Sequence, residues 1–226
     1  GNLLWLGDPG PLYGLEPLAE DLGLHFGAGT IVDPESQLFG INNPTVIVVP
    51  SYDTTQAITK DFKTTTAYAA ATDVEIGKGD GWKAETFLQT LPRSWLATGK
   101  LQGQVVYDPK RGDKLGPLPL GVSLTRSVPG AAGAAPAEQR VVVVGDGDFL
   151  SNSYLGSGGN LDLGLNILNW LAHDDRYINI DARQAPDLTL SLSAPAQAVI
   201  GFGFLLVLPV IFLIAGITVW IRRRRR

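Results

Sequence analysis

Two acidic residues in a glycine-rich turn are the first candidates for chemistry in this chain. Asp146 and Asp148 alternate with Gly145 and Gly147, directly after the apolar run at 140–144. Such a run predicts a buried strand, and open α/β sheets bind ligands where their parallel strands end. Two carboxylates at this spacing could hold a hard cation such as Mg²⁺. We favour the architectural alternative, in which one aspartate caps the next helix and the glycines form the turn, because no third acid lies nearby in the sequence.

A second polar segment follows a few residues later. The glycine-rich stretch at 156–160 ends in Asn160 and precedes an apolar pattern with helical spacing. Free backbone N–H groups at a helix start could bind an anion. A connector with Asn160 as the N-cap is the alternative that we favour. With Asn152 between the two segments, the candidate ligand-binding residues are Asp146, Asp148, Asn152 and Asn160.

Other catalytic and metal chemistry has little support in the sequence. The chain has no cysteine, which excludes thiolate nucleophiles, and it has neither a GxSxG elbow nor a Walker A motif. Of its two histidines, His25 is predicted to lie near a helix end, and His173 with Asp174 and Asp175 could form a metal cluster. A solvated helix end is the interpretation that we favour for His173. We therefore predict no catalytic residue, no metal and no cofactor.

The elements that must position these residues alternate between strand and helix patterns. Short apolar or β-branched runs predict strands at 3–6, 30–32, 45–49, 64–71, 83–91, 118–127, 140–145 and 177–180. Helical spacing predicts helices at 12–22, closed by Gly23, and at 160–172, with an apolar face of Leu161, Leu165, Leu168 and Leu171. The stretch 95–114 is predicted to be turn-rich. Strands alternating with helices predict an α/β fold with a mostly parallel sheet that is covered on both faces.

The C-terminal segment has the pattern of a membrane anchor. From Val199 to Ile221 it carries no charge, and a helix of this length spans about 34 Å, enough to cross a hydrocarbon core of ~30 Å. Pro209 is predicted to kink this helix, and Trp220 is predicted to lie at the membrane interface. Arg222 opens the terminal run of arginines at 222–226, which places the tail in the cytoplasm and the soluble part on the opposite side.

Composition excludes some partners and bears on the domain boundaries. Five of the 18 basic residues are the terminal arginines, so the rest of the chain holds 13 basic against 22 acidic residues. Such an acidic domain is not expected to bind nucleic acid. Because the sequence lacks methionine and begins beside an apolar run, we expect the α/β domain at 1–185 to be incomplete at its N-terminus. A linker at 186–198, a membrane helix at 199–221 and a cytoplasmic tail at 222–226 follow.

Several segments together resemble one protein family. The stretch RVVVVGDGDFLSNSYLGSGGNLDLGLNILNWLAHDD at 140–175 resembles the signature of GldG-type auxiliary components of ABC transporters, which are linked by name to gliding motility. GNLLWLGDPG at 1–10 and LAEDLGLHFGAGTIVDP at 18–34 resemble further family segments in the same order. QAITKDF at 56–62 resembles the pattern HPITxxF, although Gln56 and Ala57 replace His-Pro.

The resemblance implies both a fold and a function. The fold would be class I glutamine-amidotransferase-like and flavodoxin-related, without a counterpart of the catalytic cysteine. The chain would be a non-catalytic accessory or substrate-recognition subunit beside an ABC permease and ATPase in the bacterial inner membrane, with its soluble domain in the periplasm. The alternative is a membrane-anchored extracytoplasmic hydrolase that acts on envelope polymers through Asp146 and Asp148.

Overall fold

The chain divides into two units, which are described separately here. A computed structural model of the protein describes residues 1–99, 101, 105–130, 136–174 and 200–225. The first unit is Gly1–Ala182 and the second is Arg183–Arg226. The predicted strand at 177–180, the predicted linker at 186–198 and Val199 lie outside the described residues.

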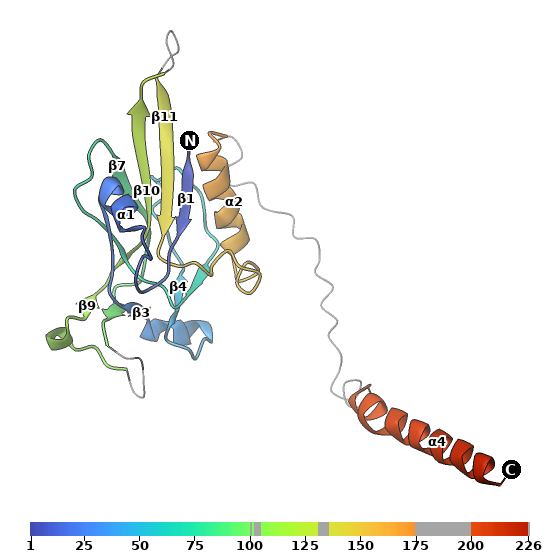
Figure 1. Cartoon of the computed structure of the whole chain (residues 1–226). Helices are drawn as coiled ribbons and strands as arrows, with labels where there is room; N and C mark the ends of the chain where they lie inside the picture. Colours follow the sequence, from blue (N-terminus) through green and yellow to red (C-terminus); the bar gives the residue numbers. More distant parts are fainter. Residues whose placement is uncertain (100, 102–104, 131–135, 175–199, 226) are drawn as a thin grey trace. The chain divides into compact units, whose positions relative to one another are not determined.

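The main sheet of the first unit has four strands of mixed direction (Figure 1). Their order is β1 (Leu3–Leu6), β11 (Ala137–Val144), β10 (Pro119–Val128) and β7 (Lys83–Gln89). Strands β1 and β11 are parallel, whereas β10 pairs antiparallel with both β11 and β7. One parallel pairing therefore stands beside two antiparallel ones.

The remaining strands form three small antiparallel sheets. They pair β2 (Leu24–Phe26) with β6 (Val74–Ile76), β4 (Val46–Val49) with β5 (Thr66–Ala69), and β8 (Trp95–Ala97) with both β3 (Thr30–Val32) and β9 (Lys114–Leu115). The prediction of a mostly parallel, flavodoxin-related and amidotransferase-like α/β fold is therefore wrong. The prediction failed for a physical reason. An apolar run indicates that a strand is covered on both faces, but it does not indicate whether the neighbouring strands are parallel or antiparallel to it.

Two hydrophobic clusters cover the two faces of the main sheet. Val142 and Val144 of β11 face the cluster that includes Ile167 of helix α2 (Asn160–Leu171). Val141 and Val143 face the opposite cluster, which includes Leu22 of helix α1 (Glu16–Leu22). Successive valines thus enter different cores, which explains why the whole run is apolar.

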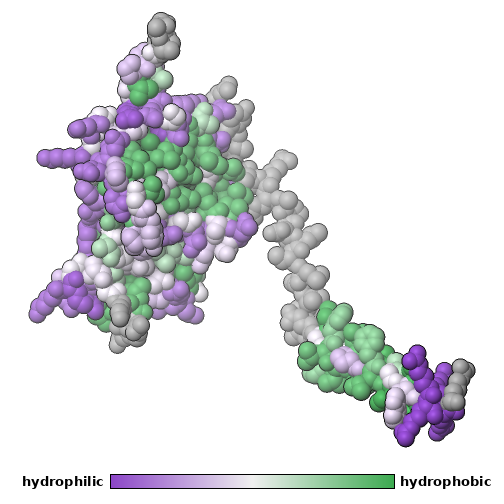
Figure 2. All heavy atoms as spheres, in the orientation of Figure 1, coloured by the Kyte–Doolittle hydropathy of each residue, from purple (hydrophilic) through white to green (hydrophobic). Residues whose placement is uncertain are grey.

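Helix α2 has nearly the predicted bounds but buries a different face. Its buried apolar residues are Leu163, Ile167, Trp170 and Leu171. Leu168, which the sequence pattern placed on the buried face, is 50% exposed. Figure 2 shows hydrophobic residues gathered over the region where Figure 1 places β1, β11 and α2. Of the leucines in the predicted apolar pattern, Leu171 is buried, Leu161 and Leu165 are half-buried, and Leu168 is exposed.

Helix α1 is shorter than the sequence predicts. Residues 12–15 form a loop, and the helix begins at Glu16, followed at once by Pro17. Gly23 ends it in the left-handed conformation with φ 66°, as the sequence predicts for a C-cap. Two 3₁₀ helices, η1 (Pro34–Phe39) and η2 (Pro109–Arg111), each begin after an aspartate that accepts a backbone N–H bond. His25 lies just past the end of α1, as predicted, and belongs to β2.

The described part of the second unit contains one helical segment, Ile200–Arg224, long and apolar enough to cross a membrane. Its first part contains a π-helical turn, η4 (Gly203–Val207), and α4 (Leu208–Arg224) continues from it. Pro209 lacks the N–H that would bond to the carbonyl one turn earlier, and the π-helical turn ends two residues before it. The kink predicted at Pro209 stays a prediction. Hydrophobic side chains line this segment up to the polar arginines at its end (Figure 2).

Candidate functional site

The loop after β11 turns Asp146 into the protein interior. The Asp146 side chain is fully buried. Its Oδ2 accepts a hydrogen bond of 2.7 Å from the Ala69 N–H of β5, and its Oδ1 accepts one of 2.7 Å from the Asp148 N–H. Asp146 therefore joins the end of the main sheet to the smaller β4–β5 sheet.

The glycines of this loop are required by close packing. A Cβ on Gly145 would lie 2.0 Å from the Thr72 carbonyl oxygen, and the Thr72 N–H donates a bond of 2.7 Å to the Gly145 carbonyl. A Cβ on Gly147 would lie 2.7 Å from Asp8 Oδ2, and the Gly147 N–H donates to Asp8 Oδ1 at 2.8 Å. Gly145 needs the absence of a side chain because backbone atoms block a Cβ there, whereas at Gly147 the contact is with the end of the exposed Asp8 side chain, which can shift.

Asn160 connects three segments through its side chain. Its Oδ1 accepts a bond of 2.9 Å from the Ala67 N–H, and its Nδ2 donates to the carbonyls of Ala67, Phe149 and Tyr154 at 2.8–3.1 Å. Asn160 is the first residue of α2, while Gly159 holds the N-cap position without a side-chain bond. The favoured interpretation of Asn160 as an N-cap is therefore wrong, because its amide bonds to β5 and to the preceding loop.

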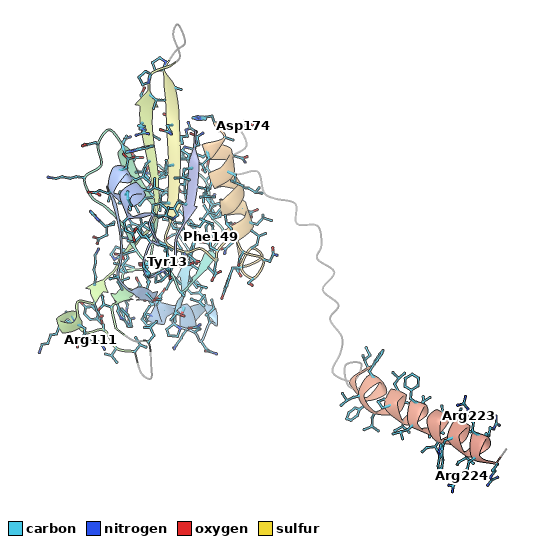
Figure 3. All side chains as sticks on the ribbon, in the orientation of Figure 1. Tyr13, Arg111, Phe149, Asp174, Arg223 and Arg224 are labelled. Atoms are coloured by element: carbon cyan, nitrogen blue, oxygen red, sulfur yellow. The ribbon has the colours of Figure 1, made fainter. Side chains whose placement is uncertain are left out.

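The other two candidates point away from this network. Asp148 and Asn152 are both exposed. No hydrogen bond of either side chain is found among the residues that the structure describes, so Asp148 does not cap a helix there. Phe149, next to Asp148, is fully buried and packs with its ring centroid 5.4 Å from that of Tyr68 (Figure 3). The side chains of Asp146 and Asn160 thus both hydrogen-bond to the same strand, β5. Asp148 and Asn152 lie on the surface.

Asp8 is a third acid at this loop that sequence reasoning missed. It lies far away in the sequence but follows β1, and the parallel pairing of β1 with β11 brings the ends of both strands together. Within the described ranges, no group of three His, Cys, Asp or Glu side chains could hold a metal ion. Asp175 of the proposed His173 cluster lies outside those ranges.

Burial changes the acidity of Asp146. Loss of solvent raises the pKa of this carboxyl to about 6, although the two backbone N–H bonds oppose the rise. The negative charges of Asp148 and Asp8 add to the increase. A carboxyl with this pKa could exchange a proton near neutral pH, but both of its oxygens are already engaged by backbone donors.

A row of buried hydroxyl groups lies beside the same loop. The Tyr52 hydroxyl is 2.5 Å from Thr66 Oγ1, which donates to the Tyr68 hydroxyl at 2.9 Å. Burial raises the pKa of both tyrosine hydroxyls, and the charge of Asp146 adds to the rise at Tyr68. Alternating side chains of β5 place Thr66 and Tyr68 on one face, which the predicted strand at 64–71 already implied.

Three cavities lie elsewhere on the first unit. The first, of about 360 Å³, is lined by 49–53 and by parts of β7. The second, of about 290 Å³, lies between 55–58 and the polar ends of β7, β10 and β11. The third, of about 350 Å³, lies against α1. None of these three cavities is lined by Asp146, Asp148, Asn152 or Asn160.

The anchor residues that the structure describes lie on one exposed helix. Pro209, Trp220 and Arg222 belong to α4, whose side chains are all unburied within the second unit. The Arg224 guanidinium lies 5.4 Å from the centroid of the Trp220 ring. An aromatic residue beside cations is typical of the end of a membrane helix.

Comparison with known proteins places the chain in a family. A family model described as "ABC-type uncharacterized transport system", for auxiliary components, matches residues 1–171. The chain belongs to this family. The match confirms the predicted relationship to ABC-transport auxiliary components, while the narrower GldG type stays a prediction. A comparison with curated proteins found no match.

A solved structure supports the corrected fold. The chain is similar to one described as "mmIFT52 N-terminal domain", with a TM-score of 0.51 and 16% identity. The similarity covers 76% of this chain and 64% of that chain. At this identity, the likeness concerns the fold alone.

Proposed function

We propose that this member of the auxiliary family is a non-catalytic, membrane-anchored accessory subunit of an ABC transport system. The observation that carries the proposal is the family match over residues 1–171, followed in the same chain by a helix of membrane-spanning length at Ile200–Arg224. The internal bonds of Asp146 and Asn160 support a non-catalytic role, since these side chains stabilise the fold. The partners would be the permease and ATPase subunits, in a GldG-type system.

The arginine tail supports one orientation in the membrane. Because cytoplasmic flanks are rich in arginine, the run at 222–226 would stay in the cytoplasm. The domain at 1–185 would then be extracytoplasmic, in the periplasm of a bacterium with two membranes. The linker at 186–198 would lead to the membrane helix at 199–221 in the inner membrane.

The orientation can be measured with reporter fusions to the full chain. Alkaline phosphatase, active only in the periplasm, should be active when inserted before Asp187 and inactive when fused after Arg226. Replacing all five arginines with glutamine should reduce this difference, whereas five lysines should preserve it. Activity only at the C-terminal fusion would contradict the extracytoplasmic placement.

The accessory role needs a second experiment. The tagged full chain, purified from its own membranes in mild detergent, should carry permease and ATPase subunits in a fixed ratio. A matched control that keeps 1–198 and the arginines but has an unrelated membrane helix shows whether the anchor takes part. Purification of the unaltered chain, intact but without transporter subunits, would contradict the proposed function, whereas loss of the subunits from the control alone would show that the anchor takes part in binding.

A further inference from the structure

A projecting loop and helix α1 form an unusual surface on the first unit. The Tyr13 side chain is 90% exposed and that of Leu15 is 46% exposed (Figure 3). Between this loop and β2 lies the cavity of about 350 Å³. We call the surface made by residues 10–20 and 24–26 the α1 face. Large apolar side chains that project beside a cavity are typical of protein interaction sites.

The α1 face has an apolar floor and an acidic rim. Leu12, Ala19, Leu24 and Phe26 line the cavity with apolar groups. Glu16 and Glu20 line it as well, one turn apart on α1, so their carboxylates lie on the same side of the helix. The cavity therefore offers an apolar side chain a place to bury and offers an adjacent cation two carboxylates.

Charge along the chain reinforces this polarity. Residues 1–59 contain seven acidic residues and neither lysine nor arginine, and the imidazole of His25 also lines the cavity. Glu16, Glu20 and Asp21 on α1 are all exposed. A partner that approaches the α1 face thus meets negative charge, which attracts basic polypeptides and repels acidic ones.

The backbone also holds the aromatic ring outward. Tyr13 has φ 51°, a left-handed conformation that non-glycine residues seldom adopt, and it lies next to Gly14 with φ 96°. Its side chain is nevertheless almost fully exposed, so core packing does not explain the conformation. Strained residues of this kind are concentrated at functional sites.

We propose that the α1 face binds a polypeptide segment in which an apolar side chain is flanked by lysine or arginine. The apolar side chain enters the cavity over Leu12 and Phe26, the flanking cations pair with Glu16 and Glu20, and the Tyr13 ring covers the segment. This inference is independent of the accessory role, because the α1 face would bind such a segment whichever assembly contains it. Failure of the binding test would therefore leave the proposed function standing.

The test uses defined peptides and the full chain in nanodiscs of neutral phosphatidylcholine, which do not themselves attract cations. The probe is a fluorescent peptide of sequence Lys-Lys-Trp-Leu-Lys-Lys, with binding followed by fluorescence anisotropy at low and physiological salt. The comparison peptides are Glu-Glu-Trp-Leu-Glu-Glu and Lys-Lys-Ser-Ser-Lys-Lys. We expect only the first peptide to bind, and to bind more weakly as salt increases.

Three variants locate the binding. Glu16→Gln with Glu20→Gln should weaken binding about threefold to tenfold, as expected for two exposed ion pairs. Tyr13→Asn removes the ring but keeps a residue that tolerates a left-handed backbone, and it should also weaken binding severalfold without unfolding the protein. The matched control, Asp61→Asn with Asp80→Asn, removes two exposed acids outside α1 that line none of the three cavities.

The outcomes separate a site from a general charge effect. A loss of affinity confined to the cavity pair and to Tyr13→Asn supports the proposal. An equal loss of affinity in the Glu16→Gln, Glu20→Gln variant and in the control double variant would mean that the peptide responds to the overall negative charge rather than to a site. That result would overturn the proposal. Equal binding of the acidic peptide or of the serine peptide would overturn it as well.

Discussion

The loop after β11 and the α1 face use similar residue types in opposite ways. In the loop, Asp146 and Asn160 are buried, and their side chains meet backbone partners at hydrogen-bonding distance. On the α1 face, Tyr13 and Leu15 project outward, and the acids beside them are exposed. The comparison shows that polar residues whose spacing resembles a binding motif can have all their hydrogen bonds within the fold. A surface without such a motif can still expose side chains that are available to a partner.

The two regions should also respond differently to mutation. A buried polar group that loses its partner is costly, since nothing replaces the missing bond. An exposed side chain can be changed at little cost to folding, and its removal affects association instead. Measurements of stability should therefore separate the loop from the α1 face.

The largest expected effect is at Asn160. Asn160→Ala removes four hydrogen bonds in a buried setting and should lower the free energy of unfolding by about 4 kcal/mol. The matched control Asn152→Ala deletes the same side chain at an exposed position and should change it by less than about 0.5 kcal/mol. Denaturant unfolding of the full chain in detergent micelles, followed by tryptophan fluorescence, measures both. A loss under about 1 kcal/mol at Asn160 would remove the contrast between the regions.

The next effect is a pH dependence that comes from Asp146. Its pKa is about 6 in the folded protein and 3.8 ordinarily, so the unfolded state binds fewer protons between these values. Stability from this group is therefore fully present below pH 3.8 and lost as the pH rises through 6, by up to about 3 kcal/mol. Asp146→Asn should flatten this part of the stability profile.

The pH comparison has internal controls. Burial also raises the pKa of Asp33 and Asp73, but these carboxyls are present in the parent and the variant alike. Asp148→Asn, two residues away and exposed, removes one of the charges that raise the pKa of Asp146 and should reduce the slope only in part. Unfolding curves at several pH values between 4 and 7 give the slopes, and identical slopes for the parent and Asp146→Asn would contradict the assignment.

The smallest effects should occur at the exposed positions. Asp148→Ala and Tyr13→Asn are both expected to change the free energy of unfolding by less than about 0.5 kcal/mol. The reason differs, since Asp148 makes no side-chain hydrogen bond with the described residues and Tyr13 projects into solvent. Thermal unfolding of each variant beside the parent tests this, and a loss above 1 kcal/mol at Asp148 would place it with Asp146.

Local patterns predicted many elements of this fold. The strand at 140–145, the helix at 160–172 and the uncharged C-terminal helix all appear close to their expected bounds. Each has a strong periodicity or an unbroken apolar run, which local chemistry specifies without help from the rest of the chain. The sequence also indicated that Gly145 and Gly147 matter for the turn after the strand. The structure shows instead that a Cβ at either position would approach a neighbouring residue closely.

Long-range pairings account for what the sequence could not predict. The direction of β10 depends on its two neighbours, and the short strand Trp95–Ala97 pairs with Thr30–Val32 on one side and with Lys114–Leu115 on the other. The partners of Asn160 lie up to 93 residues away, so its spacing to nearby residues suggested a cap instead. The ligand-binding role of the four candidate residues stays a prediction.

The π-helical turn in the second unit has a geometric consequence for any helix beside it. A π turn contains one more residue than an α turn, so it advances the side chains that follow by about 100° around the axis. Residues before Gly203 and after Val207 therefore share a stripe at a spacing of about eight rather than seven positions. Removing one residue from this turn would restore a regular helix, in which the same side chains share the stripe at a spacing of about seven positions.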